Sequence, residues 1–203
     1  MELWIATGNK GKLSEYKMLI QKEVPDLKIF SQADLPSFSP RPEDGKTFED
    51  NARIKSKTLR SVKNQAWILG EDSGLEVEGL NNLPGIHTAR YAGPHASDSE
   101  NVAKLLKMMQ IRPMNNRNAR FVCSTVVFTP EGVEWTFVGE LKGTIATKPA
   151  GLHGFGYDAV FIPEGQTQTL AELGTGYKNQ HSHRAVAAKA FIEKFKVTAA
   201  GQS

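Results

Sequence analysis

Residues 2–12 read ELWIATGNKGK, an apolar run that passes through a polar turn with two glycines and ends on lysine. The apolar part predicts a short buried strand at Glu2–Ala6, and Thr7–Gly11 is the turn that follows it. Lys12–Lys22 then predicts a helix, because its apolar residues recur at helical spacing. A strand that enters a helix through such a turn indicates an α/β fold.

The rest of the chain continues this pattern, with alternating strands and helices early and mainly strands in the middle. The predicted strands are Leu27–Ser31, Ala66–Glu71, Glu76–Leu80, Ala119–Phe128, Val133–Ala146 and Ala159–Ile162. The predicted helices run from Thr47 to about Asn64, from the Ser97–Glu100 capping box onward, and over Ser182–Lys196. The 203 residues show no internal repeat, so we expect one domain, 1–203, with a mixed α/β sheet.

Composition excludes several classes of protein. The net charge is only +3 and the basic residues are scattered, which argues against nucleic acid as a partner. No apolar run approaches the ~18 residues of a membrane span, and the first residues lack the basic segment of a secretory signal. The single cysteine, Cys123, excludes an internal disulfide. Together these features predict a protein of the reducing cytoplasm.

The turn after the first strand is suited to phosphate. Its residues are Thr7, Gly8, Asn9, Lys10, Gly11 and Lys12. A glycine-bearing turn at a helix N-terminus groups backbone N–H donors, and the lysines, solvated without ligand, add positive charge. The glycine spacing is not that of a P-loop, and Leu13 stands where that motif has Ser or Thr. An ordinary tight turn is the alternative.

Two further segments carry acids. Asn51 and Lys55 are four residues apart and share a face of the predicted helix, with Asp50 beside them. The segment EDSG, residues 71–74, ends a predicted strand, and ligands of α/β sheets bind at strand ends. Carboxylates there suit Mg²⁺, which takes one or two of them together with substrate phosphates. A capped helix start and a plain turn are the alternatives.

A glycine loop and a basic helix start complete the set. Phe155 and Tyr157 lie in the glycine loop, where aromatic rings either stack on a base or seal the sheet. Lys178, His183 and Arg184 provide donors for phosphate or base oxygens, or else form a solvated basic helix end. Jointly, the segments supply phosphate donors, metal carboxylates, a stacking ring and base donors, which together describe a nucleoside triphosphate site.

Spaced motifs run through nearly the whole chain. They are Thr7-Gly8-Asn9 with Lys12; Phe48 to Asn51-Ala52 with Lys55; Asp72-Ser73-Gly74-Leu75; Pro84-Gly85 with Ala89-Arg90-Tyr91-Ala92-Gly93; Gly154-Phe155-Gly156-Tyr157-Asp158 with Phe161; Ala171-Glu172-Leu173; and Ser182-His183-Arg184 with Ala187. In order and spacing the chain resembles the inosine/xanthosine triphosphate pyrophosphatase family, the non-canonical purine NTP pyrophosphatases.

The resemblance implies an elongated mixed β-sheet flanked by helices, with two lobes and a central nucleotide-binding cleft, usually in a homodimer. It implies Mg²⁺-dependent hydrolysis of ITP, dITP or XTP to the monophosphate and pyrophosphate. The loop Pro84–Gly93 would lie at the dimer interface. Many relatives carry Glu at the position of Asp50, and Asp is common where this chain has Glu71.

The family's roles carry over by position. Thr7–Lys12 would hold the phosphates, with Asn51, Lys55 and Ser73 as further substrate contacts. Asp72 would accept the proton and, with Asp50, hold Mg²⁺. The nucleoside pocket would be formed by Phe155, Gly156, Tyr157, Asp158, Lys178, His183 and Arg184.

These roles predict a base preference. Donors at His183 and Arg184 favour a 6-keto purine, so we expect ITP, XTP and dITP as good substrates and ATP to be rejected. Guanine would be rejected if its 2-amino group met a steric wall or another donor, such as backbone N–H groups in Gly154–Asp158, and the sequence leaves open which group does this. We expect GTP turnover to be lower by roughly 10²-fold, the scale of steric exclusion. Two other functions stay open: a nucleotide- or nucleic-acid-binding module without catalysis, and a related pyrophosphatase for modified pyrimidines.

Overall fold

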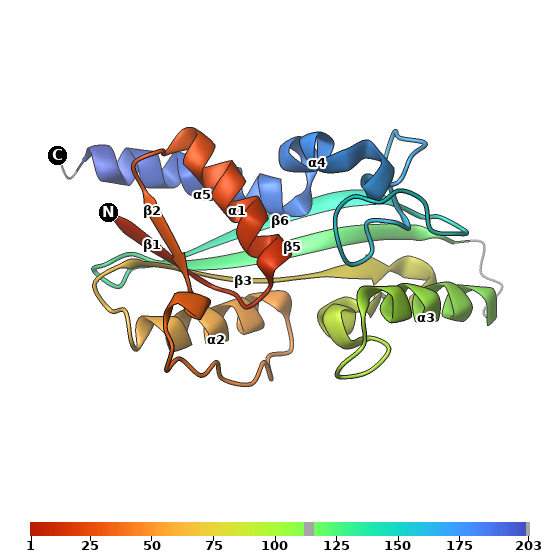
Figure 1. The fold of residues 1–203 in the computed structure, drawn as a ribbon, viewed down its shortest axis with the longest axis horizontal. Helices are drawn as coiled ribbons and strands as arrows, with labels where there is room; N and C mark the ends of the chain where they lie inside the picture. The colour runs from red at the N-terminus through yellow and green to blue at the C-terminus, as the bar shows by residue number, and fades with distance from the viewer. Residues whose placement is uncertain (112–115, 202–203) are drawn as a thin grey trace. The chain divides into compact units, whose positions relative to one another are not determined.

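The computed structural model describes residues 1–111 and 116–201, which form a mixed α/β fold around one sheet (Figure 1). The strands are β1 (Glu2–Ala6), β2 (Lys28–Ser31), β3 (Trp67–Val77), β4 (Leu83–Pro84), β5 (Asn118–Phe128), β6 (Glu134–Ile145) and β7 (Phe161–Pro163). The helices are α1 (Lys10–Glu23), α2 (Phe48–Arg60), α3 (Asp98–Ile111), α4 (Leu170–His181) and α5 (His183–Ala200). Three 3₁₀ turns join them: η1 (Gln32–Asp34), η2 (Glu78–Leu80) and η3 (Gly85–Arg90).

The sheet contains both parallel and antiparallel pairs, in the order β2-β1-β3-β5-β6-β7 with β4 on β3. β1 runs parallel to β2 and to β3, whereas the β3–β4 and β6–β7 pairs are antiparallel. The expected mixed sheet flanked by helices is thereby confirmed. Among the described helices, none is both long and apolar enough to cross a membrane.

The chain divides into two compact units. Unit 1 consists of Met1–Asp72, Cys123–Gly139 and Arg184–Ser203, and unit 2 of Ser73–Val122 and Glu140–His183. Each unit has an apolar core of its own.

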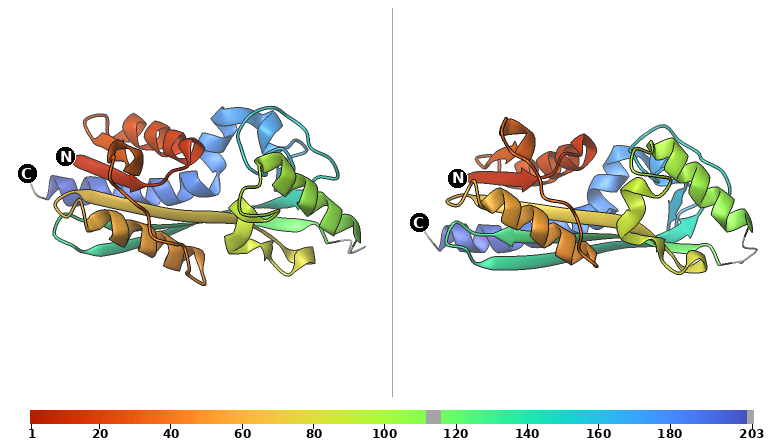
Figure 2. Two further views of the ribbon diagram at one scale, coloured as in Figure 1. Left: turned by 60° about the horizontal axis from the view of Figure 1, so that its bottom comes forward. Right: turned by 90° about the horizontal axis from the view of Figure 1, so that it is seen from below.

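In unit 1 the alternation of side chains along β1 sends apolar residues to both faces of the sheet. Leu3 and Ile5 pack into a core shared with α1 and α5, whereas Trp4 and Ala6 pack into a core shared with α2. Figure 1 shows α2 on the opposite side of these strands from α1 and α5, and Figure 2 shows the same helices from two further directions. Unit 1 is therefore a sheet covered by helices on both faces.

Helix α2 approaches β3 very closely at Gly70. A Cβ atom at this position would collide with the carbonyl oxygen of Ala52 and with the backbone nitrogen of Ser56. Only glycine allows the helix to lie this near the strand. The close contact brings the neighbouring side chains of α2, Asn51 and Lys55, to the part of β3 that follows Gly70.

The prediction that a strand ends at Glu71 is wrong, because β3 continues without a break to Val77. The strand end that was expected after Glu71 is instead the end of the neighbouring strand, β1. β1 ends at Ala6, which lies opposite Gly70 of β3. Asp72 therefore lies just beyond the last residue pair between β1 and β3, although it is in the middle of its own strand.

Helix α4 was not predicted from the sequence. Its two glycines are poor helix formers, and the helix is kinked at Gly174, which has φ +80°. The available signal was Thr169, which with Glu172 forms a complete capping box at the start of α4. The capping box predicted at Ser97 is present, and the helix predicted from Thr47 also begins at a capping box, formed by Thr47 and Asp50.

Candidate active site

The turn after β1 is built as the N-terminal cap of α1. The side-chain oxygen of Asn9 accepts the N–H of Lys12 at 3.0 Å, and the Thr7 hydroxyl accepts the N–H of Asn9 at 3.1 Å. Because Asn9 is the cap, α1 begins at Lys10, two residues earlier than predicted, and Lys10 and Gly11 belong to its first turn. The turn thus presents the N-terminus of a helix, at which anions are favoured.

Lys12 is not solvated as expected. Its ammonium nitrogen lies 2.9 Å from Oε1 of Glu71, and its side chain is only 15% exposed. Glu71 lies on β3 with its side chain 1% exposed, so it needs charged partners inside the protein. The lysine of the phosphate-suited turn is therefore positioned by a buried carboxylate.

Glu71 belongs to a buried ionic network with Arg184 and Glu15. Nε of Arg184 lies 2.8 Å from Oε2 of Glu71, and Nη1 lies 2.5 Å from Oε2 of Glu15. Burial by itself would raise the pKa of Glu71, but Arg184 and Lys12 outweigh it and hold that pKa well below its ordinary value. Glu71 is consequently ionised in the folded protein.

These contacts bear on the predicted role of Arg184. Its side chain is 1% exposed and donates to two carboxylates, so the structure gives it the role of holding Glu71 in place. Its predicted contact with a purine base finds no support in these contacts. Sequence reasoning missed Glu15, although an acid beside buried Tyr16 in the apolar stripe of α1 was a signal.

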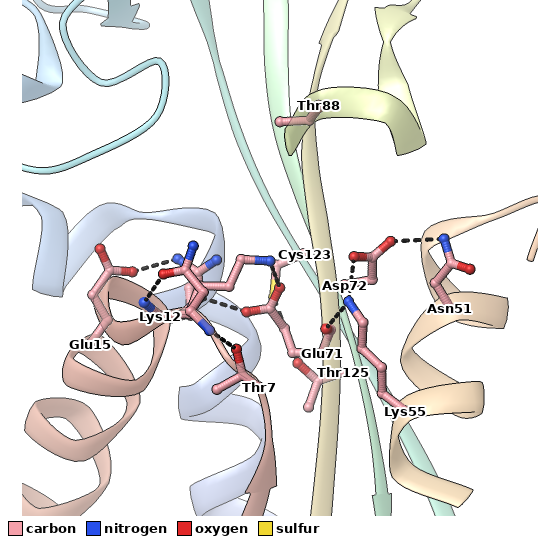
Figure 3. A network of polar contacts seen from close by, with 12 residues as sticks. Thr7, Lys12, Glu15, Asn51, Lys55, Glu71, Asp72, Thr88, Cys123 and Thr125 are labelled. Atoms are coloured by element: carbon pink, nitrogen blue, oxygen red, sulfur yellow. Dashed lines mark hydrogen bonds and ion pairs between the residues drawn. The ribbon is translucent and has the colours of Figure 1, made fainter. Parts of the chain in front are cut away.

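The carboxylate of Asp72 is held by two side chains of α2 (Figure 3). Nδ2 of Asn51 donates to Oδ2 at 3.1 Å, and the ammonium of Lys55 donates to Oδ1 at 2.8 Å. Asn51 is fixed in turn, because its own oxygen accepts the N–H of Gly45 at 2.9 Å. The helix face predicted from the sequence therefore does meet Asp72.

The ammonium group of Lys55 has three acceptors, which matches its three N–H donors. They are Asp72, the carbonyl oxygen of Glu71 at 3.1 Å and the carboxylate of Glu43 at 3.0 Å. Burial would lower the pKa of Lys55, but Asp72 and Glu43 outweigh it and raise that pKa. Glu43 was missed because it lies in a charged loop with no local pattern that distinguishes it.

Asp50 serves as a helix cap. Its carboxylate accepts the N–H groups of Lys46 and Thr47, and the Thr47 hydroxyl accepts the N–H of Asp50. This is the capped helix start that the sequence left open, and these contacts give no support to Asp50 as a metal ligand. Within residues 1–111 and 116–201, no three His, Cys, Asp or Glu side chains are grouped so that they could hold a metal ion.

In unit 2 the glycine loop at 154–158 is held by its own side chains. The Asp158 carboxylate accepts the N–H of Phe155 at 2.9 Å and the ammonium of Lys178 at 2.6 Å. The same ammonium lies 4.2 Å from the centre of the Phe155 ring. Gly154 has φ +81°, and a Cβ there would collide with the Asp158 carboxylate, so the loop requires glycine at this position.

Two more contacts fasten this loop to neighbouring segments of unit 2. The N–H of Gly156 donates to Asp98 at 2.6 Å, and the phenol of Tyr157 donates to the carbonyl oxygen of Thr88 at 3.0 Å. Tyr157 is 2% exposed, and burial raises its pKa well above the ordinary value. Since the N–H groups of Phe155 and Gly156 are already bonded, the predicted repulsion of guanine by these amides finds no support.

The predicted residues thus fall into two sets. Unit 1 brings together Thr7, Gly8, Asn9, Lys10, Gly11, Lys12, Asn51, Lys55, Asp72 and Arg184. Unit 2 carries Ser73, Phe155, Gly156, Tyr157, Asp158, Lys178 and His183. In unit 2, the imidazole of His183 is 4% exposed and stacks on the ring of Phe121, with ring centres 4.8 Å apart.

Lys12→Ala is expected to weaken folding as well as affinity for triphosphate. Buried Glu71 would lose one of its charged partners, which costs roughly 1–3 kcal/mol. Urea unfolding measures this loss, and the KM for ITP measures the affinity. Lys10→Ala is the matched control, because Lys10 is exposed in the same turn and its loss should leave the unfolding free energy unchanged. Equal stability of both variants would contradict the buried pair.

Known proteins match this chain over nearly its whole length. The model of the Ham1 family matches residues 3–194. A protein of Bdellovibrio bacteriovorus named dITP/XTP pyrophosphatase is 78% identical over 194 residues, covering 96% of this chain and 97% of its own. A protein of the same name from Bacillus licheniformis is 40% identical, covering 93% and 94%.

Solved structures agree with these sequence matches. A HAM1 protein from Coxiella burnetii superposes with a TM-score of 0.87 at 31% identity, covering 97% of this chain and 98% of its own. The Ham1 protein of Staphylococcus aureus superposes with a TM-score of 0.85 at 36% identity, covering 98% and 100%. The resemblance drawn from the sequence motifs is confirmed, and the chain belongs to the Ham1 family.

Proposed function

We propose that this protein hydrolyses non-canonical purine nucleoside triphosphates, ITP, dITP and XTP, to the monophosphate and pyrophosphate. The names of the relatives support this substrate class. The observation that carries the proposal is the carboxylate of Asp72, fixed by Asn51 and Lys55 in the same unit as the anion-suited turn before α1. A positioned carboxylate and a phosphate-binding turn are what hydrolysis of a phosphoanhydride requires.

In the proposed reaction, water attacks the α-phosphorus and the bond to the β-phosphate oxygen breaks, so that pyrophosphate leaves. Asp72 accepts a proton from the attacking water. Lys55 has all three donors engaged, so we assign it to orienting Asp72 and setting the local charge. The proton taken up by Asp72 is returned to solvent before the next turnover.

The phosphates would lie at the N-terminus of α1. The N–H groups of Asn9 and Lys12 are used by the cap, whereas those of Lys10 and Gly11, in the first turn of the helix, have no hydrogen-bond partner among the described residues. Backbone donors at a helix start hold anions without needing a side chain. Lys12, positioned by Glu71, adds a charge to the same turn.

The charges of unit 1 support our proposal that a divalent cation binds together with the substrate. The ionic network contains the carboxylates of Glu15, Glu43, Glu71 and Asp72 and the cations of Lys12, Lys55 and Arg184. Every one of these cations is already paired with a carboxylate, so the network does not neutralise a triphosphate. Carboxylate oxygens and phosphates are the ligands that Mg²⁺ prefers, so the residues present fit this ion.

We propose Asp72 and Glu43 as its protein ligands, because both carboxylates contact the same ammonium group of Lys55. When bound, Mg²⁺ would neutralise phosphate charge and polarise the phosphoryl oxygens. Glu43→Gln is therefore expected to raise the Mg²⁺ concentration needed for half-maximal turnover by about tenfold. Asp50→Asn should leave that concentration unchanged, because its carboxylate caps α2. The reverse result would restore Asp50 as the ligand.

For the base, we propose the ring of Phe155 as the stacking surface, with Lys178, Asp158 and His183 as polar contacts. Phe155 is half-buried, and the ammonium of Lys178 lies close to its ring. The phenol of Tyr157 donates to the carbonyl oxygen of Thr88, so we assign it to holding the loop rather than to direct contact with the base. A 6-keto oxygen accepts from a cationic donor, whereas the 6-amino group of adenine does not, so ATP should be rejected by roughly 10⁴-fold.

The test is a panel of nucleoside triphosphates, incubated with and without Mg²⁺, with pyrophosphate as the measured product. We expect ITP, dITP and XTP to have the highest kcat/KM, GTP about 10²-fold lower, and no turnover in EDTA. No turnover of any nucleotide would favour a binding module, and preference for modified pyrimidines would favour the related pyrophosphatase. Equal kcat/KM values for ITP and GTP would contradict the proposed base selection.

We further propose a homodimer of the reducing cytoplasm. The loop Pro84–Gly93 is assigned to the dimer contact by family resemblance, and Leu83 beside it exposes 42% of its surface. The lone thiol of Cys123 is buried, and burial raises its pKa to about 12, which fits a cysteine that forms no disulfide. Sedimentation at micromolar concentration should show the dimer, and a monomer alone would contradict it.

A further inference from the structure

Thr88 makes three hydrogen bonds inside unit 2, all from the short turn η3. Its hydroxyl accepts the N–H of Leu75 at 2.9 Å and donates to the carbonyl oxygen of Gly85 at 2.6 Å. Its own carbonyl oxygen accepts the phenol of Tyr157 at 3.0 Å. One threonine thus joins strand β3, the turn η3 and the glycine loop.

The bond to Leu75 matters because of its place on β3. The ladder between β3 and β4 begins at Glu76, which lies opposite Pro84, so Leu75 lies just outside it. Leu75 is fully buried, so its N–H requires a partner other than water. The Thr88 hydroxyl is that partner, three residues along β3 from Asp72.

The bond from Tyr157 matters because it anchors the proposed base-contacting loop. The two residues beside Tyr157 are held by other bonds. The N–H of Gly156 donates to Asp98, and the carboxylate of Asp158 accepts from Lys178. The side-chain bond of Tyr157 reaches Thr88, the residue that also bonds β3 at Leu75. Thr88 thus has hydrogen bonds to both β3 and the glycine loop.

We propose that Thr88 is a positioning residue that couples the base-contacting loop to the strand that carries Asp72. The inference rests on the proposed function, and it gives the segment Pro84–Gly93 a task beyond dimer contact. A base that stacks on Phe155 and shifts the glycine loop would move the phenol of Tyr157 and the Thr88 carbonyl bonded to it, and through η3 the N–H contact of Leu75. Correct base binding and correct placement of Asp72 are thereby favoured together.

A double-mutant cycle tests this coupling. Thr88→Val removes the hydroxyl and keeps the shape, whereas Tyr157→Phe removes only the phenol oxygen. Each is expected to lower kcat/KM for ITP about tenfold, since small misplacements of reacting groups have effects of this size. Independent effects would multiply, so the double variant would lose about a hundredfold in kcat/KM. If Thr88→Val already frees η3, the phenol bond contributes less, and the double variant should lose only about twentyfold.

Matched variants separate positioning from folding. Thr88→Ser keeps the hydroxyl and should restore kcat/KM to within about twofold of the wild type. Thr58→Val makes the same chemical change in α2, where the hydroxyl donates to the carbonyl oxygen of Ile54, and should leave kcat/KM unchanged. If Thr88→Val fails to fold, Tyr157→Phe still tests the link, because the ITP to GTP ratio of kcat/KM should fall about fivefold.

The affinity of the same variants for ITP can be measured by calorimetry in EDTA, where we expect no turnover. This gives the double-mutant cycle a second measured quantity that does not depend on hydrolysis. Failure of the wild type to hydrolyse any nucleotide would overturn the proposed function, and non-additive losses of affinity would still support the coupling. The coupling would be overturned if the losses of kcat/KM and of ITP affinity in the single variants multiplied in the double variant. It would also be overturned if Thr88→Val left both quantities unchanged. The proposed function would stand in either case.

Discussion

Asp72→Asn is expected to lower kcat for ITP by about a thousandfold, because an amide does not accept a proton from water and binds Mg²⁺ weakly. In the wild type, Lys55 at 2.8 Å and Asn51 at 3.1 Å hold the two carboxylate oxygens. The amide keeps an oxygen for Lys55 but directs its N–H₂ group toward the donor of Asn51. Some stability is lost at that contact, although the fold should persist.

Single-turnover kinetics with ITP and a thermal melt followed by circular dichroism would measure the two effects separately. Asp44→Asn makes the same change at an exposed carboxylate of the preceding loop, and should retain wild-type kcat. A well-folded Asp72→Asn variant with near-normal turnover would remove Asp72 from its role as the proton acceptor.

Glu71→Gln is expected to destabilise the protein by about 3–5 kcal/mol, the range for removing one partner of a buried ion pair. Arg184, which is 1% exposed, would keep its charge and lose one of the two carboxylates that it contacts, Glu71 and Glu15. Lys12 would also lose its partner, so affinity for triphosphate should change as well. Urea unfolding at neutral pH measures the free energy.

The carboxylate of Glu71 also makes the unfolding free energy depend on pH. The pKa of Glu71 in the folded protein lies well below its value in the unfolded chain, about 4.3. Its contribution is therefore complete above that unfolded value and is lost as the pH falls through the folded pKa. Below about pH 4 the unfolding free energy of the wild type should drop more steeply than that of Glu71→Gln.

Glu23→Gln is the control for both measurements. Glu23 pairs with Lys196 at 2.7 Å, but both side chains are about half exposed, at 48% and 47%, so water screens the pair. Its loss should leave the melting temperature unchanged. If Glu71→Gln were equally harmless, the buried network would not be a source of stability.

Local patterns in the sequence sufficed for the elements whose signals are local. The strand, turn and helix at residues 2–23, the helix caps at Thr47 and Ser97, and the shared face of Asn51 and Lys55 all follow from spacing within one segment. The motif order sufficed for the family. These parts needed no knowledge of which strand neighbours which.

The remaining features depend on contacts between distant segments. The edge beside Asp72 arises because β1 stops opposite Gly70, which no pattern within β3 reveals. Lys12 was expected in solvent because its partner Glu71 lies 59 residues away in the chain. Arg184 shows the same limit, since its partners Glu71 and Glu15 lie 113 and 169 residues away.

Unit 1 is assembled from three separated stretches of chain, the last of which begins at Arg184. During synthesis from the N-terminus, Glu15 and Glu71 leave the ribosome long before the arginine that neutralises them is made. Until then the nascent chain carries two acids, destined for the interior, without their main counter-ion. Removal of the α5 segment should therefore leave unit 1 unable to close its core, and a stop codon before residue 184 should yield a product prone to aggregation and proteolysis rather than a smaller working enzyme.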